Sequence, residues 1–282
     1  MIPLLDVLRK TEGFFREKGI STPRLDAELL LAHVLGLERL QLYLRFDQPL
    51  TDKDLETLRP LVRRRGLREP LAYVLGTKGF HRLDLAVRPG VLVPRPDTET
   101  LVEAALEWIG TPTEPVFVAD VGAGTGAVGL AIAHTLPQVR VYETDLSPEA
   151  LACTRENVAT LQLGDRVAVL EGSLLDPIPA RRPIDWVVSN PPYIPSRVID
   201  TLEPEVAKHE PRLALDGGLD GLGPYRLLIP QARARARKGL LVEVGHDQAD
   251  AVGAMFEAAG FTDVRTWTDL GGHRRVVGGK IP

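Results

Sequence analysis

The sequence Val116-Phe-Val-Ala-Asp-Val121, followed by Gly122-Ala-Gly-Thr-Gly126 and by an apolar run from Ala127 to Ala133, decides the fold of this chain. The six residues before the first glycine predict a buried parallel strand, because only Asp120 among them is polar. The glycines allow a tight turn and a close approach to a ligand, and the apolar run predicts a helix whose first N–H groups are free. A strand, a glycine loop and a helix start in this order bind nucleotides.

A second strand pattern, Val139 to Thr144, ends at Asp145. A carboxylate at that place can accept both hydroxyls of a ribose, although Asp145 can also cap the helix that begins after Ser147-Pro148. The run from Gly124 to Gly129 also satisfies the dinucleotide fingerprint G-x-G-x-x-G, which by itself is a weak signal. Gly129 can equally serve only to let a helix pack closely on a strand.

Strand and helix patterns alternate from residue 99 onward. Strands are predicted near residues 116, 139, 166, 185 and 240, and then over 262–268 and 274–278. This alternation predicts an α/β fold with a doubly wound, Rossmann-like sheet, and it places ligands beyond the carboxyl ends of the strands. We therefore predict one nucleotide-binding domain over residues 99–282.

Residues 1–75 predict a small helical bundle. The apolar positions recur with a helical period, first at Leu4, Leu5 and Leu8 and then at Leu25, Leu29 and Ala32. Between the bundle and the sheet, residues 76–98 predict a β-hairpin linker, with a turn signal at Arg88-Pro-Gly90. The basic run of Arg63, Arg64 and Arg65 with Arg68 predicts a solvated helix face, or else a surface for an acidic protein or for ribosomal RNA.

Composition points to an ordinary globular protein. The chain has 282 residues, is 44% hydrophobic and carries a net charge of −4. Its single cysteine, Cys153, excludes an internal disulfide and is expected to be buried in a helix. No apolar run predicts a signal peptide or a membrane span, which indicates a cytoplasmic protein. The six histidines show no metal-ligand spacing, so no metal site is predicted, and no basic footprint for DNA is evident.

Asn190-Pro-Pro-Tyr193 follows the strand pattern that ends at Ser189. Neither Pro191 nor Pro192 has an N–H, and the position before a proline is pushed toward an extended backbone, so the loop is stiff and rich in acceptors. The Asn190 side-chain oxygen and the Pro191 carbonyl can each accept one hydrogen of an NH2 group, with the Tyr193 ring as a flat wall. Read alone, the same residues can be a simple turn.

Together, Asp120-x-Gly122-x-Gly124, Asp145 and Asn190-Pro-Pro-Tyr193 resemble the amino-methylating class of S-adenosylmethionine methyltransferases. Further segments narrow this resemblance to the peptide chain release factor glutamine N5-methyltransferase family. These segments are Pro70-Leu-Ala-Tyr73, Val93-Pro-Arg95-Pro-Asp-Thr-Glu99, Glu210-Pro211, Gly217-Gly-x-Asp220-Gly221 and Glu243-x-Gly245. The segment from Arg95 to Glu99 discriminates, since Asn-Pro-Pro-Tyr is shared with adenine methylases of DNA.

The resemblance implies S-adenosylmethionine as cofactor and class I release factors as substrates, methylated on the glutamine of their Gly-Gly-Gln motif. It implies catalysis by Asn190, Pro191, Pro192 and Tyr193, which also hold the substrate together with Arg95, Thr98 and Glu99. It implies that the cofactor is bound by Asp120, Gly122, Ala123, Gly124, Thr125, Gly126, Asp145, Ser173, Leu174 and Asn190. Residues 1–75 are then expected to recognise the substrate.

The chain departs from this pattern at Gly172-Ser173-Leu174, where such enzymes commonly carry an acidic or amide residue for adenine. Ser173 and Leu174 can still contact the base, or Asp176 can take that place. The segment 196–224 is long for a simple connection and is predicted either as a substrate lid or as a disordered surface loop. Two rival functions stay open: methylation of adenine or guanine amino groups in nucleic acid, and a noncatalytic cofactor-binding or assembly role.

Overall fold

The predicted strands form a single sheet in the computed structural model, which describes residues 2–282. Its seven strands are β5 (Val116–Val121), β6 (Val139–Asp145), β7 (Val167–Glu171), β8 (Trp186–Ser189), β9 (Gly239–Glu243), β10 (Thr262–Thr268) and β11 (Arg274–Lys280). They are ordered β10-β11-β9-β8-β5-β6-β7. Strands β5 to β9 are parallel, whereas β11 runs antiparallel to β9 and to β10. The doubly wound sheet is confirmed, with an antiparallel pair at one edge.

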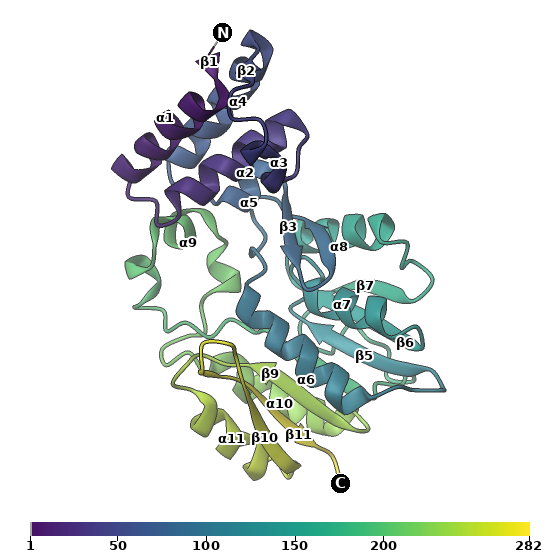
Figure 1. Cartoon of the computed structure of the whole chain (residues 1–282). Helices are drawn as coiled ribbons and strands as arrows, with labels where there is room; N and C mark the ends of the chain where they lie inside the picture. Colours follow the sequence, from purple (N-terminus) through teal and green to yellow (C-terminus); the bar gives the residue numbers. More distant parts are fainter. Residues whose placement is uncertain (1) are drawn as a thin grey trace. The chain divides into compact units, whose positions relative to one another are not determined.

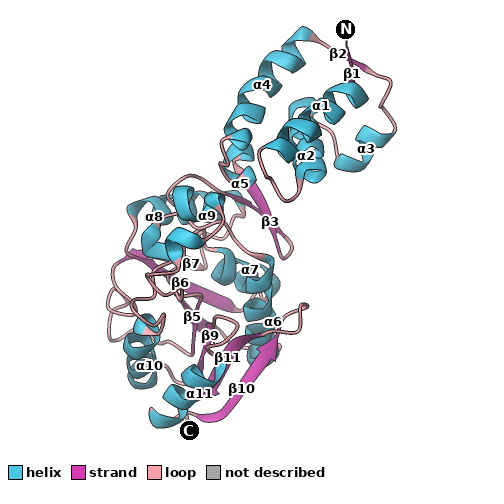
Figure 2. Ribbon diagram, turned by 90° about the vertical axis from the view of Figure 1, so that its left-hand side faces the viewer, coloured by secondary structure: helices cyan, strands magenta, loops and turns pink. Residues whose placement is uncertain are grey.

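Helices cover both faces of this sheet. They are α6 (Glu99–Ile109), α7 (Ala127–Thr135), α8 (Pro148–Thr160), α10 (Gly223–Arg235) and α11 (Ala249–Ala258). Successive strand residues point to opposite faces. Thus Val118 packs in one apolar cluster with α6 and α7, while Ala119 packs in another with α10 and α11. Figure 2 shows α6 and α7 on one side of the strands and α10 on the other. Burial on both faces explains the nearly continuous apolar strands.

A β-hairpin precedes the sheet in the chain. It consists of β3 (Thr77–Phe80) and β4 (Leu83–Ala86), and η1 (Pro96–Thr98) follows it before α6. The turn lies at His81 and Arg82, where His81 has a φ of 53°. The expected turn at Arg88-Pro-Gly90 was therefore placed too late, because Leu85 and Val87 belong to the strand and its continuation. The Asn157 side chain of α8 holds the hairpin by bonding both Ala86 N (2.7 Å) and Ala86 O (3.1 Å).

The remaining helices form a separate compact unit, which comprises residues up to Gly76 together with Glu203–His209. It contains β1 (Ile2–Pro3), α1 (Leu4–Glu17), α2 (Pro23–Leu35), α3 (Arg39–Tyr43), β2 (Pro49–Leu50), α4 (Asp52–Gly66), α5 (Leu71–Leu75) and α9 (Pro204–His209). The helical bundle is visible in Figure 1. Thr77–Leu202 and Glu210–Pro282 form the other unit, so the chain leaves the sheet unit for seven residues and returns to it.

The buried face of α2 agrees only in part with the predicted one: Ala32 is buried as predicted, but Leu25 is not. Leu4 and Leu8 of α1 are fully buried as expected, but Leu25 of α2 is 36% exposed. In its place, Asp26 and Glu28 are buried. Apolar periodicity cannot find such positions, because these carboxylates enter the interior only with cationic partners.

Asp26 finds its partner in the basic run. Arg65 is buried and donates to Asp26 Oδ2 (2.7 Å) and to Glu205 Oε1 of α9 (2.9 Å). Arg68 donates to Glu205 and, at 2.8 Å, to Glu203 Oε2. The expectation of a solvated face was wrong for Arg65, and the acidic partner of these arginines is a segment of the chain itself.

The segment 196–224 is ordered, so its interpretation as a disordered loop was wrong. It contains η2 (Ile199–Thr201), α9 and η3 (Arg212–Ala214). Asp216 fastens the return of this segment to the sheet unit, since it pairs with Ile194 in a parallel bridge and accepts a 2.5 Å hydrogen bond from Ser196 Oγ. Cys153 is buried, as predicted. Within residues 2–282, every helix falls short of the length and apolarity that a membrane span requires.

Candidate active site

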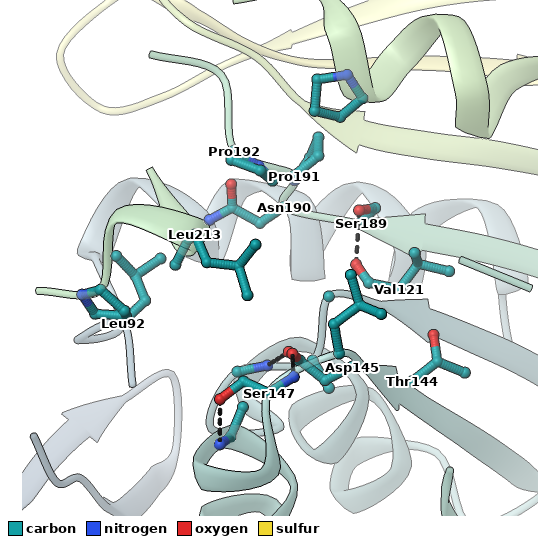
Figure 3. A pocket seen from close by; sticks show the side chains of 18 of the residues that line it. Leu92, Val121, Thr144, Asp145, Ser147, Ser189, Asn190, Pro191, Pro192 and Leu213 are labelled. Carbon is teal, nitrogen blue, oxygen red and sulfur yellow. Dashed lines mark hydrogen bonds between the residues drawn. The ribbon is translucent and has the colours of Figure 1, made fainter. Parts of the chain in front are cut away.

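A cavity of about 760 Å³ lies at the carboxyl ends of β5, β6, β7 and β8. All residues that line it belong to the sheet unit. The chain runs outward from β5 to β6 and β7 on one side and to β8 and β9 on the other, so the cavity occupies the switch point of the sheet, where open α/β folds bind ligands. Figure 3 shows Val121, Asp145 and Asn190, each from a different strand end, around this cavity.

The glycine loop lines the cavity through Gly122, Ala123, Gly124 and Thr125. Gly122 and Gly124 have φ values of 74° and 59°, and open space surrounds the place that a Cβ would take on either. Backbone conformation alone therefore demands glycine here. Gly126 does not line the cavity; it has a φ of 79° and packs against Leu130 and Thr154 at the start of α7.

Asp145 anchors this loop. Its Oδ2 accepts the Gly124 N–H at 2.9 Å, and its Oδ1 accepts the Ser147 N–H at 2.8 Å. The helix cap of α8 is Ser147, whose Oγ accepts the Ala150 N–H, so Asp145 is not the cap. Each carboxylate oxygen keeps a further lone pair, which leaves Asp145 able to accept the hydroxyls of a ribose at the cavity wall.

Asp120 bonds the helix that follows the glycine loop. It is 2% exposed and its Oδ2 accepts the Gly129 N–H at 2.8 Å. Burial raises the pKa of Asp120 to about 7, and burial together with the charge of Asp120 raises the pKa of Glu143 well above its usual value. Gly129 faces Glu143 and does not line the cavity. Its role in the fingerprint is thus helix packing.

The Asn190 loop forms the next wall. Asn190, Pro191 and Pro192 line the cavity, and Figure 3 labels them together with Leu213, which lines the same cavity. The Ser189 hydroxyl, one residue earlier, donates to the Val121 carbonyl at 2.7 Å and ties the end of β8 to the end of β5. The Asn190 Nδ2 donates to the Thr98 hydroxyl oxygen at 3.1 Å. Thr98 also lines the cavity, so the structure brings these two predicted residues together.

Tyr193 lies behind the cavity and does not line it. Its hydroxyl donates to Glu243 Oε1 at 3.2 Å, and its carbonyl accepts Gln248 Nε2 at 2.9 Å. Burial and the nearby Glu243 carboxylate raise the pKa of Tyr193. In this structure the ring supports the loop from behind; it does not form the wall that we expected.

The segment from Arg95 to Glu99 divides between two roles. Arg95 lines the cavity and donates to both oxygens of the buried Glu210 carboxylate at 2.7 Å. Burial raises the pKa of Glu210, and the Arg95 charge opposes that shift. Glu99, in contrast, lies outside the cavity lining, and its Oε1 accepts the His81 N–H of the hairpin turn at 3.0 Å.

The end of β7 supplies Gly172, Ser173 and Leu174 to the cavity. Leu174 has a φ of 49°, and its carbonyl accepts the Thr144 hydroxyl at 2.8 Å. Asp176, the alternative adenine contact, does not line the cavity and instead accepts Gln231 Nε2 at 2.7 Å. Ser173 and Leu174 therefore line the cavity, whereas Asp176 does not.

Sequence reasoning missed two parts of the site. Leu92, Leu213 and Leu227 line the cavity although each belongs to a segment without a strand-end signal. Glu243 was noted only as part of a motif, yet its carboxylate lies under the Asn190 loop. The sequence marks it by one signal: an acidic residue follows directly after the four apolar residues of β9.

The cavity fits a nucleoside cofactor. Its volume is in the usual range for small-molecule sites, and Val121, Leu146 and Leu174 offer apolar surface for a base beside the Asp145 carboxylate. The glycine loop leaves space for close backbone approach. Within residues 2–282, no group of histidine, cysteine and acidic side chains is arranged to hold a metal ion.

Comparison with known proteins agrees with this geometry. Residues 6–76 match the family model of the PrmC N-terminal domain, and residues 104–219 match that of the methyltransferase small domain. A release factor glutamine methyltransferase from Geobacter sulfurreducens is 46% identical over 277 residues, which are 98% of this chain and 95% of that protein. One from Caulobacter vibrioides is 44% identical over 93% of this chain and 91% of its own length.

Among solved structures, the catalytic domain of hMettl16 in complex with the MAT2A 3′UTR hairpin 1 has a TM-score of 0.59. It is 14% identical and covers 79% of this chain and 83% of its own. At that identity the likeness concerns the fold alone.

Proposed function

We propose that this chain, which belongs to the release factor glutamine methyltransferase family, methylates the side-chain amide nitrogen of a glutamine in class I peptide chain release factors, with S-adenosylmethionine as methyl donor. The acceptor is the glutamine of their Gly-Gly-Gln motif, and the reaction takes place in the cytoplasm, where it modulates translation termination. The observation that carries this proposal is the Asn190 amide at the cavity wall, held by Thr98 at 3.1 Å.

The residues that line the cavity would hold different parts of the cofactor. Asp145, which holds the glycine loop, would accept the ribose hydroxyls, Ser173 and Leu174 would contact the base, and the loop backbone from Gly122 to Thr125 would lie against the amino acid part. When bound, S-adenosylmethionine supplies an electrophilic methyl group on a sulfonium.

The protein must make an amide nitrogen reactive, because its lone pair is delocalised into the neighbouring carbonyl. The Asn190 side-chain oxygen and the Pro191 carbonyl each accept one N–H of the glutamine amide, which orients the nitrogen and stabilises positive charge as it develops. Positioning of this kind contributes about 7 to 11 kcal/mol. As nitrogen gains the methyl group it becomes acidic, so it releases its proton without a dedicated base. Arg95 lines the cavity, and its hydrogen bonds to the Glu210 carboxylate hold it in place.

Two rivals remain for the same site. Methylation of a nucleic-acid amino group uses a similar acceptor pair but needs a basic recognition surface. The arginines that offered such a surface, Arg65 and Arg68, are engaged with Glu205. A noncatalytic binding role would give no function to the Asn190 amide at the cavity wall.

Methyl transfer from labelled S-adenosylmethionine tests the proposal. The acceptors are an intact release factor, the same factor with its acceptor glutamine changed to alanine, duplex DNA and ribosomal RNA. We expect label on the intact factor alone, and none with the Asn190→Ala enzyme. Label on nucleic acid but not on the factor would establish the base-methylating rival, and no label on any acceptor would leave the noncatalytic role.

A further inference from the structure

Glu243 is a buried carboxylate that the proposed chemistry does not use. It is the last residue of β9, is 1% exposed and accepts the Tyr193 hydroxyl at 3.2 Å through Oε1. Among residues 2–282, its Oε2 has no hydrogen-bond partner. A buried acid with an incompletely satisfied carboxylate is costly, so its place beneath a catalytic loop calls for a reason.

Thr98 connects this carboxylate with Asn190. The Thr98 oxygen accepts the Asn190 Nδ2 at 3.1 Å, and the buried Thr98 side chain is also a neighbour of Glu243 that lowers the pKa of its carboxyl. Asn190, Thr98 and Glu243 therefore follow one another from the cavity wall to the interior.

The direction of these hydrogen bonds matters because a hydroxyl can donate or accept. Above its pKa, Glu243 is a carboxylate that can only accept, so it can take the Thr98 hydrogen and leave Thr98 a lone pair for Asn190. Asn190 must then turn its NH2 toward Thr98 and keep its oxygen for the substrate. With no carboxylate, Thr98 can donate to the Asn190 oxygen instead, and the reversed amide presents an NH2 to the incoming NH2.

The groups that face Glu243 come from several elements. Arg275 of β11 favours the carboxylate, whereas Asp97 of η1 opposes it. The Tyr225 hydroxyl of α10 bonds the Glu243 backbone carbonyl at 2.8 Å and so leaves the carboxylate to Thr98 and Tyr193.

We propose that Glu243 is a positioning residue that sets the polarity of the methyl-acceptor site: its carboxylate orders the Thr98 hydroxyl, and Thr98 holds the Asn190 amide with its oxygen toward the substrate. Through Tyr193 the same carboxylate steadies the far end of the loop. This inference rests on the proposed function and deepens it, since an Asn190 oxygen turned toward the substrate would favour an amide over a carboxylate.

The test compares purified Glu243→Gln, Thr98→Val and Thr98→Ser enzymes with the wild type, using a release factor and labelled S-adenosylmethionine. We expect Glu243→Gln and Thr98→Val to lower kcat by about 10- to 100-fold, as the loss of an ordered hydrogen-bonding group in a site does. KM for the factor should change less than about threefold, because remote surfaces bind the factor equally before and during transfer. Thr98→Ser keeps the hydroxyl and should recover most of the activity that Thr98→Val loses.

Asp185→Asn is the matched control. Asp185 is also buried, but it lies just before the amino end of β8, away from the carboxyl ends that border the cavity, and it accepts the Phe117 N–H at 2.9 Å. Its replacement should leave kcat unchanged. A loss in Asp185→Asn as large as that in Glu243→Gln would show general destabilisation and overturn the inference.

A second measurement tests directly which way the Asn190 side-chain amide is turned. A release factor whose acceptor glutamine is replaced by glutamate should inhibit the wild type weakly, since carboxylate oxygens would face acceptors. It should inhibit Glu243→Gln at least about fivefold more strongly, because a reversed Asn190 amide donates to a carboxylate.

The outcomes separate the two proposals. Suppose that the wild type labels the factor, and that Glu243→Gln and Thr98→Val show the same kcat as the wild type and the same inhibition by the glutamate-substituted factor. The inference about Glu243 is then wrong, and the proposed methylation stands. A wild type that does not label the factor overturns both. If Glu243→Gln does not fold, Thr98→Val, which retains the volume of threonine, decides the matter.

Discussion

Gly129 and Glu143 occupy one space between α7 and β6: a Cβ on Gly129 would lie 2.3 Å from Glu143 Oε1 and 2.8 Å from Val141 Cγ1. The absence of a side chain on the helix makes room for a carboxyl on the strand. Because Gly129 also donates its N–H to Asp120, this packing helps to fix the Asp120 side chain next to the glycine loop.

Gly129→Ala should therefore destabilise the protein, although alanine is the better helix former. We expect a loss of about 1 to 3 kcal/mol in the free energy of unfolding, the usual cost of overpacking. Urea unfolding measures it. The double variant with Glu143→Ala should regain most of this loss, since it removes the obstructing carboxyl. Equal or greater stability in the single variant would refute the shared-space argument.

Asp145→Ala should weaken S-adenosylmethionine binding by about 10- to 100-fold, the value of one or two hydrogen bonds to a charged group. It loses the hold on Gly124 and the ribose acceptor together. Isothermal titration with the cofactor alone is the measurement. Asp176→Ala is the control, because Asp176 bonds Gln231 outside the cavity and its loss should change affinity less than about twofold. Weakened binding in Asp176→Ala would instead restore it as the adenine contact.

Glu243 should make stability depend on pH. Its pKa is about 7 in the folded chain, mainly because burial disfavours the charge, against 4.5 as the ordinary value. Between these values the unfolded chain has already lost a proton that the folded chain keeps. Rising pH therefore favours unfolding, and stability falls from about pH 4.5 to about pH 7 and then levels.

Over this pH range, we expect Glu243 to lower the free energy of unfolding by up to about 3 kcal/mol. Glu243→Gln removes it while Asp120 and Glu143 remain in both proteins, so the difference between the two stability profiles isolates Glu243. Denaturant unfolding at a series of pH values provides the profiles. Parallel profiles for the two proteins would show that Glu243 keeps an ordinary pKa.

Arg65→Ala should cost about 3 to 5 kcal/mol in the helical unit, because it leaves the buried Asp26 carboxylate unpaired. It also removes one tie to Glu205 of α9, so proteolysis within 203–209 should become faster. Unfolding experiments and limited proteolysis measure the two effects. Arg63→Ala, at an exposed position of the same helix, should change stability by less than about 0.5 kcal/mol. Similar losses in both variants would contradict the buried-pair account.

Local sequence patterns predicted much of the fold. Glycines at 122 and 124 allow the left-handed backbone of the loop, and apolar strand runs such as 116–121 favour burial on both faces, so each was readable from neighbouring residues. The Asn190 loop was readable for the same reason, since two prolines stiffen it locally.

The sequence by itself determined the sheet, the glycine loop and the stiff loop at Asn190, because backbone stereochemistry and apolar periodicity act over a few residues. Only the tertiary structure decided which polar groups meet. Asp26 with Arg65, Asn190 with Thr98 and Tyr193 with Glu243 lie 39, 92 and 50 residues apart. Their pairing depends on the folded path of the whole chain, and the cost of burying an unpaired polar group is what makes each partner necessary.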